Sequence, residues 1–255
     1  MHSPREILIG IAYKYHGDWD KIYQSLYKKE DIKIEEINDA LNSIKCHTLT
    51  ILDEEYPESL RNIYRPPFVL YYYGDISLIK DYTKCLAVVG SRDYSLYGET
   101  ATRNIVRDLK EDIIVVSGLA NGIDAIAHQE AIKSNHKTIA VLGTGIDYCY
   151  PPENIHLYKE IKKKHLLLSE YYGDFSGKPD NFPIRNRIIV GLSKAVLVTE
   201  AKEKSGTLSS VSIASTNNRD LLVVPYPIDI KNVCNHLIQL GAYLVTNSDD
   251  VNNLM

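Results

Sequence analysis

The stretch Cys85-Leu-Ala-Val-Val-Gly-Ser-Arg92 shows the pattern that repeats through most of this chain, a short apolar run followed at once by small and polar residues. Each such run is too short for a helix and is apolar throughout, as in strands buried on both faces of a parallel sheet. The runs begin at residues 85, 113, 138, 166, 195 and 221, and amphipathic segments lie between them. This alternation predicts an α/β domain with a Rossmann-like, doubly wound, mainly parallel sheet.

The first 62 residues follow another pattern. Apolar side chains recur there at helical spacing, at Ile7, Leu8, Ile11, Ile22, Leu26, Ile34, Ile37, Leu41 and Ile44. This predicts a small all-α domain of three or four short helices over residues 1–62. Tyr64-Arg65-Pro66-Pro67 then interrupts the helical pattern, because proline lacks an amide donor and favours extended geometry in the preceding residue. We therefore expect a connector over residues 63–80, with an extended segment at 68–74, before the α/β domain of residues 81–255.

The composition is that of an ordinary globular protein, with 44% hydrophobic and 24% charged residues among 255. The net charge of −4 lacks the overall basicity typical of nucleic-acid-binding domains, although residues 159–194 contain eight Lys or Arg against four acids. The four cysteines are widely spaced, which argues against a zinc site or a disulfide framework. We see no signal peptide and no apolar run of about 18 residues, and expect a cytoplasmic protein without a membrane span.

Ligands of doubly wound sheets bind at the carboxyl ends of the strands, so the residues that follow each run are the candidates for a site. Four of these turns combine small residues with the start of a helix, which favours an anion. They are Gly90-Ser91-Arg92, the segment 117–124 with Asn121 and Gly122, Gly143-Thr-Gly145, and Ser205-Gly206-Thr207. Four such turns on one edge of the sheet predict a phosphate-binding rim.

Known catalytic and cofactor motifs do not fit. The chain has no Walker A loop, no dinucleotide fingerprint, no His-Glu-x-x-His and no nucleophile elbow. Asp124 and His128 are spaced to meet on a helix and could form a general base, but a structural pair is the favoured interpretation. Glu170 and Glu200 follow strands, yet neither has an evident third partner. We therefore predict no catalytic residue, no metal and no cofactor.

The segment from Lys178 to Ser193 carries the strongest functional signal. Arg185 and Arg187 flank an asparagine just before an expected apolar helix, and Phe182 and Lys178 precede them. Guanidinium groups bind phosphate in bidentate fashion, and aromatic faces stack on any base. The alternative is that Arg185 or Arg187 pairs with Asp180 or Glu170 and stabilises the fold. Residue chemistry alone leaves both open.

From about Tyr56 to its end, the chain resembles the DNA-processing protein A (DprA/Smf) family. The resemblance rests on motifs that occur in the expected order, namely Val88-Val-Gly-Ser-Arg92, Ser117-Gly-Leu-Ala-Asn-Gly-Ile-Asp124, Ala140-Val-Leu-Gly-Thr-Gly-Ile-Asp-Tyr-Cys-Tyr-Pro-Pro-Glu-Asn154, Leu168-Ser-Glu-Tyr171, Asn181-Phe-Pro-Ile-Arg-Asn-Arg-Ile-Ile-Val-Gly-Leu-Ser193, Thr199-Glu-Ala201 and Ser205-Gly-Thr207. It implies a Rossmann-like domain that binds single-stranded DNA and loads the RecA recombinase during natural transformation. It implies neither catalysis nor a cofactor.

Carried over by position, the resemblance implies a DNA-binding site made of the turns and of the segment from Lys178 to Ser193. Its residues are Gly90, Ser91, Arg92, Asn121, Gly122, Lys178, Phe182, Arg185, Arg187, Ser205 and Gly206. Two positions depart from the family's pattern, since Asn121 replaces its usual arginine and Pro225-Tyr226 replaces its common Pro-Gly. The N-terminal helices loosely resemble the family's sterile-alpha-motif-like domain. We expect a homodimer, and no C-terminal winged helix within this chain.

Two other hypotheses belong to different classes. The loop from Glu200 to Thr207 faintly resembles the nucleotide-processing loop of phosphoribohydrolases of the same fold type, which would need a catalytic acid and a second arginine around one small pocket. Alternatively, the N-terminal helices form a dimerisation or partner-binding module.

Overall fold

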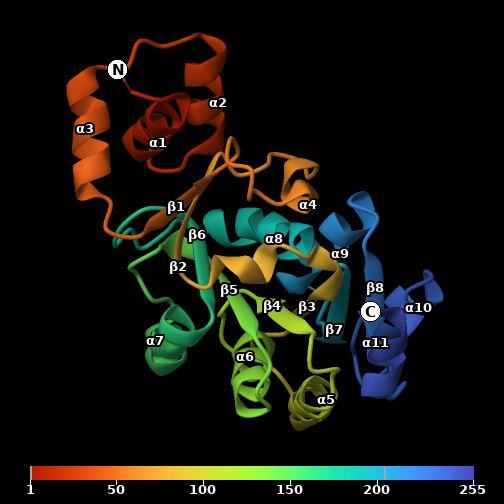
Figure 1. The fold of residues 1–255 in the computed structure, drawn as a ribbon. Helices are drawn as coiled ribbons and strands as arrows, with labels where there is room; N and C mark the ends of the chain where they lie inside the picture. The colour runs from red at the N-terminus through yellow and green to blue at the C-terminus, as the bar shows by residue number, and fades with distance from the viewer. Residues whose placement is uncertain (1, 204) are drawn as a thin grey trace.

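A mixed sheet crosses the centre of the molecule in a computed structural model that describes residues 2–203 and 205–255 (Figure 1). The strand order is β1-β2-β6-β5-β4-β3-β7-β8-β9, and all neighbours from β6 to β9 run parallel. The predicted α/β fold with a mainly parallel sheet is confirmed. The strands are β1 (His47–Thr50), β2 (Val69–Gly74), β3 (Cys85–Gly90), β4 (Ile114–Ser117), β5 (Thr138–Gly145), β6 (Leu166–Tyr171), β7 (Ala195–Glu200), β8 (Asp220–Val223) and β9 (Tyr243–Leu244).

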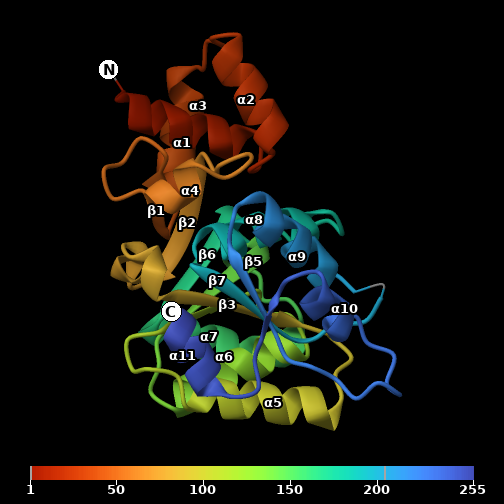
Figure 2. The same cartoon turned by 90° about the vertical axis from the view of Figure 1, so that its right-hand side faces the viewer.

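Helices cover both faces of the sheet, as the two views at right angles show (Figures 1 and 2). The helices are α1 (Pro4–Lys14), α2 (Trp19–Tyr27), α3 (Ile34–Ser43), α4 (Glu58–Arg61), α5 (Leu96–Arg107), α6 (Ile123–Lys133), α7 (Ile155–Lys164), α8 (Asn181–Gly191), α9 (Thr207–Thr216), α10 (Cys234–Gln239) and α11 (Ser248–Leu254). Short 3-10 turns lie at Ile76–Ile79, Tyr82–Lys84 and Pro152–Asn154.

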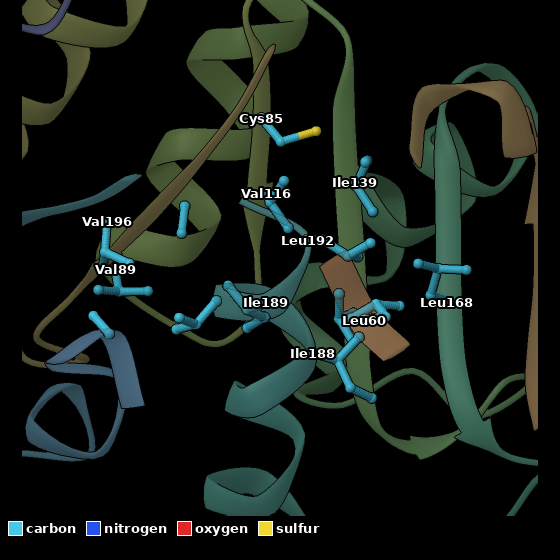
Figure 3. Close-up of a cluster of buried hydrophobic side chains, with 14 of the residues drawn as sticks. Leu60, Cys85, Val89, Val116, Ile139, Leu168, Ile188, Ile189, Leu192 and Val196 are labelled. Carbon is cyan, nitrogen blue, oxygen red and sulfur yellow. The ribbon is translucent and has the colours of Figure 1, made fainter. Parts of the chain in front are cut away.

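Alternate residues of each central strand face opposite layers. In β3, Cys85 and Val89 join the buried cluster that α4, α8 and α9 cover, whereas Leu86 and Val88 join the cluster under α5 and α6. Figure 3 shows the first cluster, in which Ile188 and Ile189 of α8 lie over the strand residues. Burial on both faces explains why the strands read as continuous apolar runs in the sequence.

The N-terminal part contains the expected helices and also a strand that the pattern did not predict. Strand β1, which lies within residues 1–62, pairs antiparallel with β2, and β2 pairs antiparallel with β6. The prediction of helices alone up to residue 62 was therefore wrong at residues 47–50, because a four-residue edge strand has too few residues to show a period. The domain boundaries at 62 and 80, and the likeness of α1 to α3 to a sterile-alpha-motif domain, stay predictions.

The chain winds outward from β3 in two directions. It proceeds from β3 through β4 and β5 to β6, then crosses to the other side of β3 and adds β7, β8 and β9. The strand order thus reverses between β3 and β7. In open parallel sheets this switch point forms a crevice at the carboxyl ends of the two strands.

No helix in the described part of the chain is long and apolar enough to cross a membrane. Within residues 2–203 and 205–255, no group of three or more His, Cys, Asp or Glu side chains is placed to hold a metal ion.

Candidate nucleic-acid interface

A cavity of about 530 Å³ opens at the switch point, between the loops that follow β3 and β7 and the start of α8. The register between the two strands shifts between Val89 and Gly90, just before the cavity, and Gly90 then pairs with Glu200. Seven of the predicted site residues line it, namely Gly90, Ser91, Arg92, Phe182, Arg185, Ser205 and Gly206. Residues from three separate turns and helices thus meet in one place.

Arg92 and Phe182 form the rim of this cavity. The Arg92 side chain is exposed, and its guanidinium carbon lies 6.0 Å from the centre of the Phe182 ring. Phe182 is half-buried in the first turn of α8 and lies against Gly143, where an added Cβ would be 2.8 Å from Cδ1 of the ring. A cation beside an aromatic face is the combination that suits a phosphate next to a base.

Tyr150 extends the rim and was missed in the sequence. The residue is 46% exposed, and the centre of its ring lies 5.3 Å from that of Phe182, at an interplanar angle of 44°. Together with Arg92 and Asn121 the two rings line a smaller, adjoining cavity of about 60 Å³. Tyr150 lies after β5, far from Phe182 in the chain, and no local pattern distinguishes it from the other tyrosines.

Arg185 lies at the floor of the cavity and is only 4% exposed. Its Nη1 donates to the carbonyl of Gly118, 2.7 Å away, and to the carbonyl of Val141. A side chain at position 118 would collide with this guanidinium, since a Cβ there would lie 2.4 Å from Nη2. Burial lowers the pKa of Arg185 to about 10, which leaves it charged at neutral pH. Arg185 therefore joins the residue after β4 to the middle of β5 and adds a positive charge beneath the cavity.

Arg187 points away from the cavity into a structural ion pair. Its Nη1 and Nη2 donate to the two carboxylate oxygens of Glu170 over 2.6 and 2.5 Å, and its Nε donates to the carbonyl of Arg65 over 2.8 Å. Both charged side chains are buried. Arg187 therefore pairs with Glu170, as the alternative interpretation of this segment had it. We do not count Arg187 among the proposed DNA contacts.

The sequence suggested that Arg185 and Arg187 lie just before a helix. In the structure they lie inside one. Helix α8 begins at Asn181, and Pro183 is tolerated because the first N–H groups of a helix need no partner within it. Lys178 is exposed three residues ahead of α8 and lines neither cavity. Its predicted role remains a proposal.

The turn between β4 and α6 depends on Gly122. This residue has φ 81°, in the region that favours glycine, and a Cβ there would lie 2.3 Å from the carbonyl oxygen of Ser91. The backbone N–H of Ile123 donates to the same oxygen over 3.2 Å. Gly122 therefore locks the loop that carries Arg92 against the start of α6, whereas Asn121 is exposed beside the smaller cavity.

The side chains considered as catalytic have structural partners. The Nδ1 of His128 lies 2.7 Å from the hydroxyl of Thr138, and Asp124 accepts a hydrogen bond from the backbone N–H of Gly118 over 3.1 Å. Glu200 is 2% exposed and accepts two hydrogen bonds of 2.9 Å from the backbone and hydroxyl of Ser95. It is not among the residues that line the cavity. Glu200 therefore does not supply the catalytic acid that the phosphoribohydrolase hypothesis needs.

Taken together, the fold and the site define a class of protein, a doubly wound α/β protein with a cationic and aromatic rim at its switch point. Residues 47–255 match the sequence profile of the family described as DNA recombination-mediator protein A, and the chain belongs to that family. The predicted membership in the DprA/Smf family is confirmed.

Curated relatives agree with this assignment. The DNA processing protein DprA of Streptococcus pneumoniae strain R6 is 43% identical over 209 residues, which cover 81% of this chain and 73% of that protein. Protein Smf of a Synechocystis strain is 42% identical over 208 residues, covering 80% of this chain and 52% of that protein.

Solved structures show the same arrangement. DprA of Streptococcus pneumoniae superposes with a TM-score of 0.81 at 36% identity, over 98% of this chain and 92% of that one. DprA of Helicobacter pylori, described for its single-stranded DNA binding mode, gives a TM-score of 0.74 at 30% identity, over 83% and 95% of the two chains.

Proposed function

We propose that this protein binds single-stranded DNA at the cavity between β3, β7 and α8, without catalysing a reaction on it. The observation that supports this best is the exposed Arg92 guanidinium beside the Phe182 ring, with the Tyr150 ring also next to Phe182. Phosphates bind such a cation, and bases stack on such rings whatever their sequence. The Helicobacter pylori relative, which is described as binding single-stranded DNA, supports the same assignment.

The test is the affinity for fluorescent oligo-dT, measured by anisotropy over a range of salt concentrations. Replacing either exposed cation, Arg92→Ala or Lys178→Ala, should weaken binding and reduce the slope of log affinity against log salt by about 1, since each removes one phosphate contact. Phe182→Ala should lower the affinity by about 1–3 kcal/mol through lost stacking.

Lys84→Ala is the matched control for the cation variants. Lys84 is also exposed, but it precedes β3 and so lies at the opposite end of that strand from Arg92. Its loss should leave the affinity unchanged. Unchanged binding in both Arg92→Ala and Lys178→Ala would overturn the proposal.

We further propose that the protein acts in the cytoplasm as a mediator that loads the RecA recombinase onto incoming DNA in natural transformation. The family description, recombination mediator, supports this role. Faster recombinase filament formation on protein-covered single strands would test it, and no acceleration would count against it.

A homodimer is the proposed assembly. The sheet ends at β9, whose Tyr243 and Leu244 are about half exposed, and the nearby Leu240 is 70% exposed. An open sheet edge with exposed apolar side chains is a natural surface for a second copy. Light scattering of the full chain measures the oligomeric state directly.

A further inference from the structure

An ion pair joins the two loops that border the main cavity. Asp93 follows β3 and Lys202 follows β7, and the Nζ of Lys202 lies 2.6 Å from a carboxylate oxygen of Asp93. Both residues line the cavity. The Asp93 backbone is fixed in turn, because the hydroxyl of Ser91 donates to its carbonyl over 2.6 Å. The pair therefore lies where a ligand enters between the two loops.

The charges that line the cavity nearly cancel in the absence of a ligand. Five lining residues are charged, namely Arg92, Asp93, Asp124, Arg185 and Lys202. At the floor, burial raises the pKa of Asp124 and lowers that of Arg185, and the charge of each residue partly opposes the shift of the other. At the mouth, Lys202 is paired with Asp93 and lowers its pKa. Within residues 2–203 and 205–255, Lys202 is the one lining cation with an ion-pair partner, and Arg92 is the exposed one that has none.

Beside Lys202, the start of α9 offers unused hydrogen-bond donors. The hydroxyl groups of Ser205 and Thr207 are buried and have no hydrogen-bond partner among the described residues, and Thr207 is only 5% exposed. The N-cap residue is Gly206, which has no side chain to cap the helix. A helix N-terminus attracts anions. A buried hydroxyl without a partner is unfavourable, so a ligand oxygen that accepts a hydrogen bond from it stabilises the complex. Both features indicate a phosphate group.

The ion pair at the mouth is weak enough to be exchanged. The Asp93 side chain is 93% exposed and that of Lys202 is 48% exposed. Exposed pairs of this kind are screened by water and salt and contribute little to stability. A phosphate held by the α9 N-terminus would offer Lys202 a second anionic partner, in a less exposed position than the Asp93 carboxylate.

We propose that Ser205, Gly206 and Thr207 form a phosphate subsite, that Lys202 is its cation, and that Asp93 is a counter-ion which the phosphate displaces. This inference rests on the proposed function and deepens it, since it assigns Lys202 and Thr207 to the site and gives Asp93 an inhibitory role. The ligand class is a phosphate ester, which is either a diester of the DNA backbone or a monoester at a strand end or on a free nucleotide.

Removing the counter-ion should strengthen binding, which is the opposite of the usual effect of a mutation in a binding site. Asp93→Asn keeps the size of the side chain and releases Lys202, so the affinity for oligo-dT should rise about two- to fivefold, the range expected for an exposed pair. Lys202→Gln and Thr207→Val should each lower the affinity. The double variant of Asp93→Asn and Lys202→Gln should bind like Lys202→Gln alone, because Asp93 weakens binding only by pairing with Lys202.

Asp112→Asn is the matched control. Asp112 pairs with Lys84 over 3.4 Å, and that lysine is 47% exposed, as Lys202 is 48% exposed. This variant changes the net charge equally but at the other end of β3. An equal gain of affinity in Asp112→Asn would show that net charge alone is responsible, and would overturn the inference.

Two further arms identify the phosphate. If the subsite binds backbone diesters, a 5′-hydroxyl oligo-dT and a 5′-phosphate oligo-dT will bind with equal affinity, and thymidine monophosphate will compete poorly. If it binds monoesters, the 5′-phosphate strand will bind more tightly and thymidine monophosphate will compete. Either kind of phosphate supports the inference, provided that Asp93→Asn increases the affinity for the corresponding probe. If the wild type binds oligo-dT through Arg92 but no probe responds to Asp93→Asn, the inference fails while the proposed function stands. If the wild type binds no strand, the proposed function itself fails.

Discussion

At the residue scale, the most informative feature is that two arginines in one short segment have different roles. Arg185 lies under the cavity and Arg187 pairs with Glu170 on another side of α8. Each residue of an α-helix turns the side-chain direction by about 100°, so positions two apart point in nearly opposite directions. Once the segment is helical, both arginines cannot face the same ligand.

The ion pair of Arg187 and Glu170 makes a prediction about stability. Both side chains are less than 10% exposed, and the hydrogen bonds to Glu170 are bidentate. Glu170→Gln or Arg187→Ala leaves one charge buried without its partner, which should lower the free energy of unfolding by about 3–5 kcal/mol. Urea denaturation at neutral pH measures this value.

The same pair of variants separates stability from binding. Under conditions in which both variants remain folded, Glu170→Gln and Arg187→Ala should bind oligo-dT like the wild type, since neither residue lines the cavity. A large loss of affinity in folded Arg187→Ala would place Arg187 back among the DNA contacts.

At the element scale, the loops around the cavity are held by hydrogen bonds between neighbouring strand ends and helix starts. Ser95 is the N-cap of α5, and its hydroxyl accepts from the N–H of Gly98 over 3.1 Å and donates to Glu200 over 2.9 Å. Glu200 is the last residue of β7. One serine therefore joins the element after β3 to the strand on the other side of the switch point.

Ser95→Ala removes this connection. It loses the cap of α5, which costs about 1 kcal/mol, and leaves the buried Glu200 carboxylate with one donor fewer, which costs about 1–3 kcal/mol more. We expect the midpoint of urea unfolding to fall accordingly, whereas Ser95→Thr, which keeps the hydroxyl, should restore most of the loss. Equal stability of the alanine and threonine variants would contradict the role of the hydroxyl.

At the scale of the whole molecule, stability should depend on pH through a histidine in the core. His128 is fully buried, and burial lowers its pKa from 6.5 to about 3. Below pH 6.5 the unfolded chain therefore takes up a proton that the folded protein does not. The free energy of unfolding should fall by up to about 1.4 kcal/mol per pH unit as the pH drops from 6.5 toward 3.

His128→Gln should flatten this dependence, and the exposed His156→Gln is its control. The measurement is the free energy of unfolding between pH 7 and pH 4. An identical slope in the wild type and His128→Gln would show that other groups are responsible, among them His165, whose pKa burial also lowers.

Much of the fold was predictable because its signals are local. Strands buried on both faces must be apolar throughout, and the turns after them need small residues, so Cys85 to Arg92 and the five later runs locate the parallel strands and their ligand edge. The edge strand β1 escaped prediction, because it is short and one strand of a pair is stabilised mainly by its neighbour.

The sequence by itself determined the mainly parallel sheet, its carboxyl edge and the membership of a DNA-processing family. Only the tertiary structure decided which side chains meet there. Tyr150 reaches Phe182, Lys202 reaches Asp93, and Arg187 turns to Glu170. These pairs join residues up to about a hundred positions apart, and their meeting depends on the rotation of α8 and on the order of strands around β3. Periodicity in a sequence reports the face on which a residue lies, but not the partner that lies opposite.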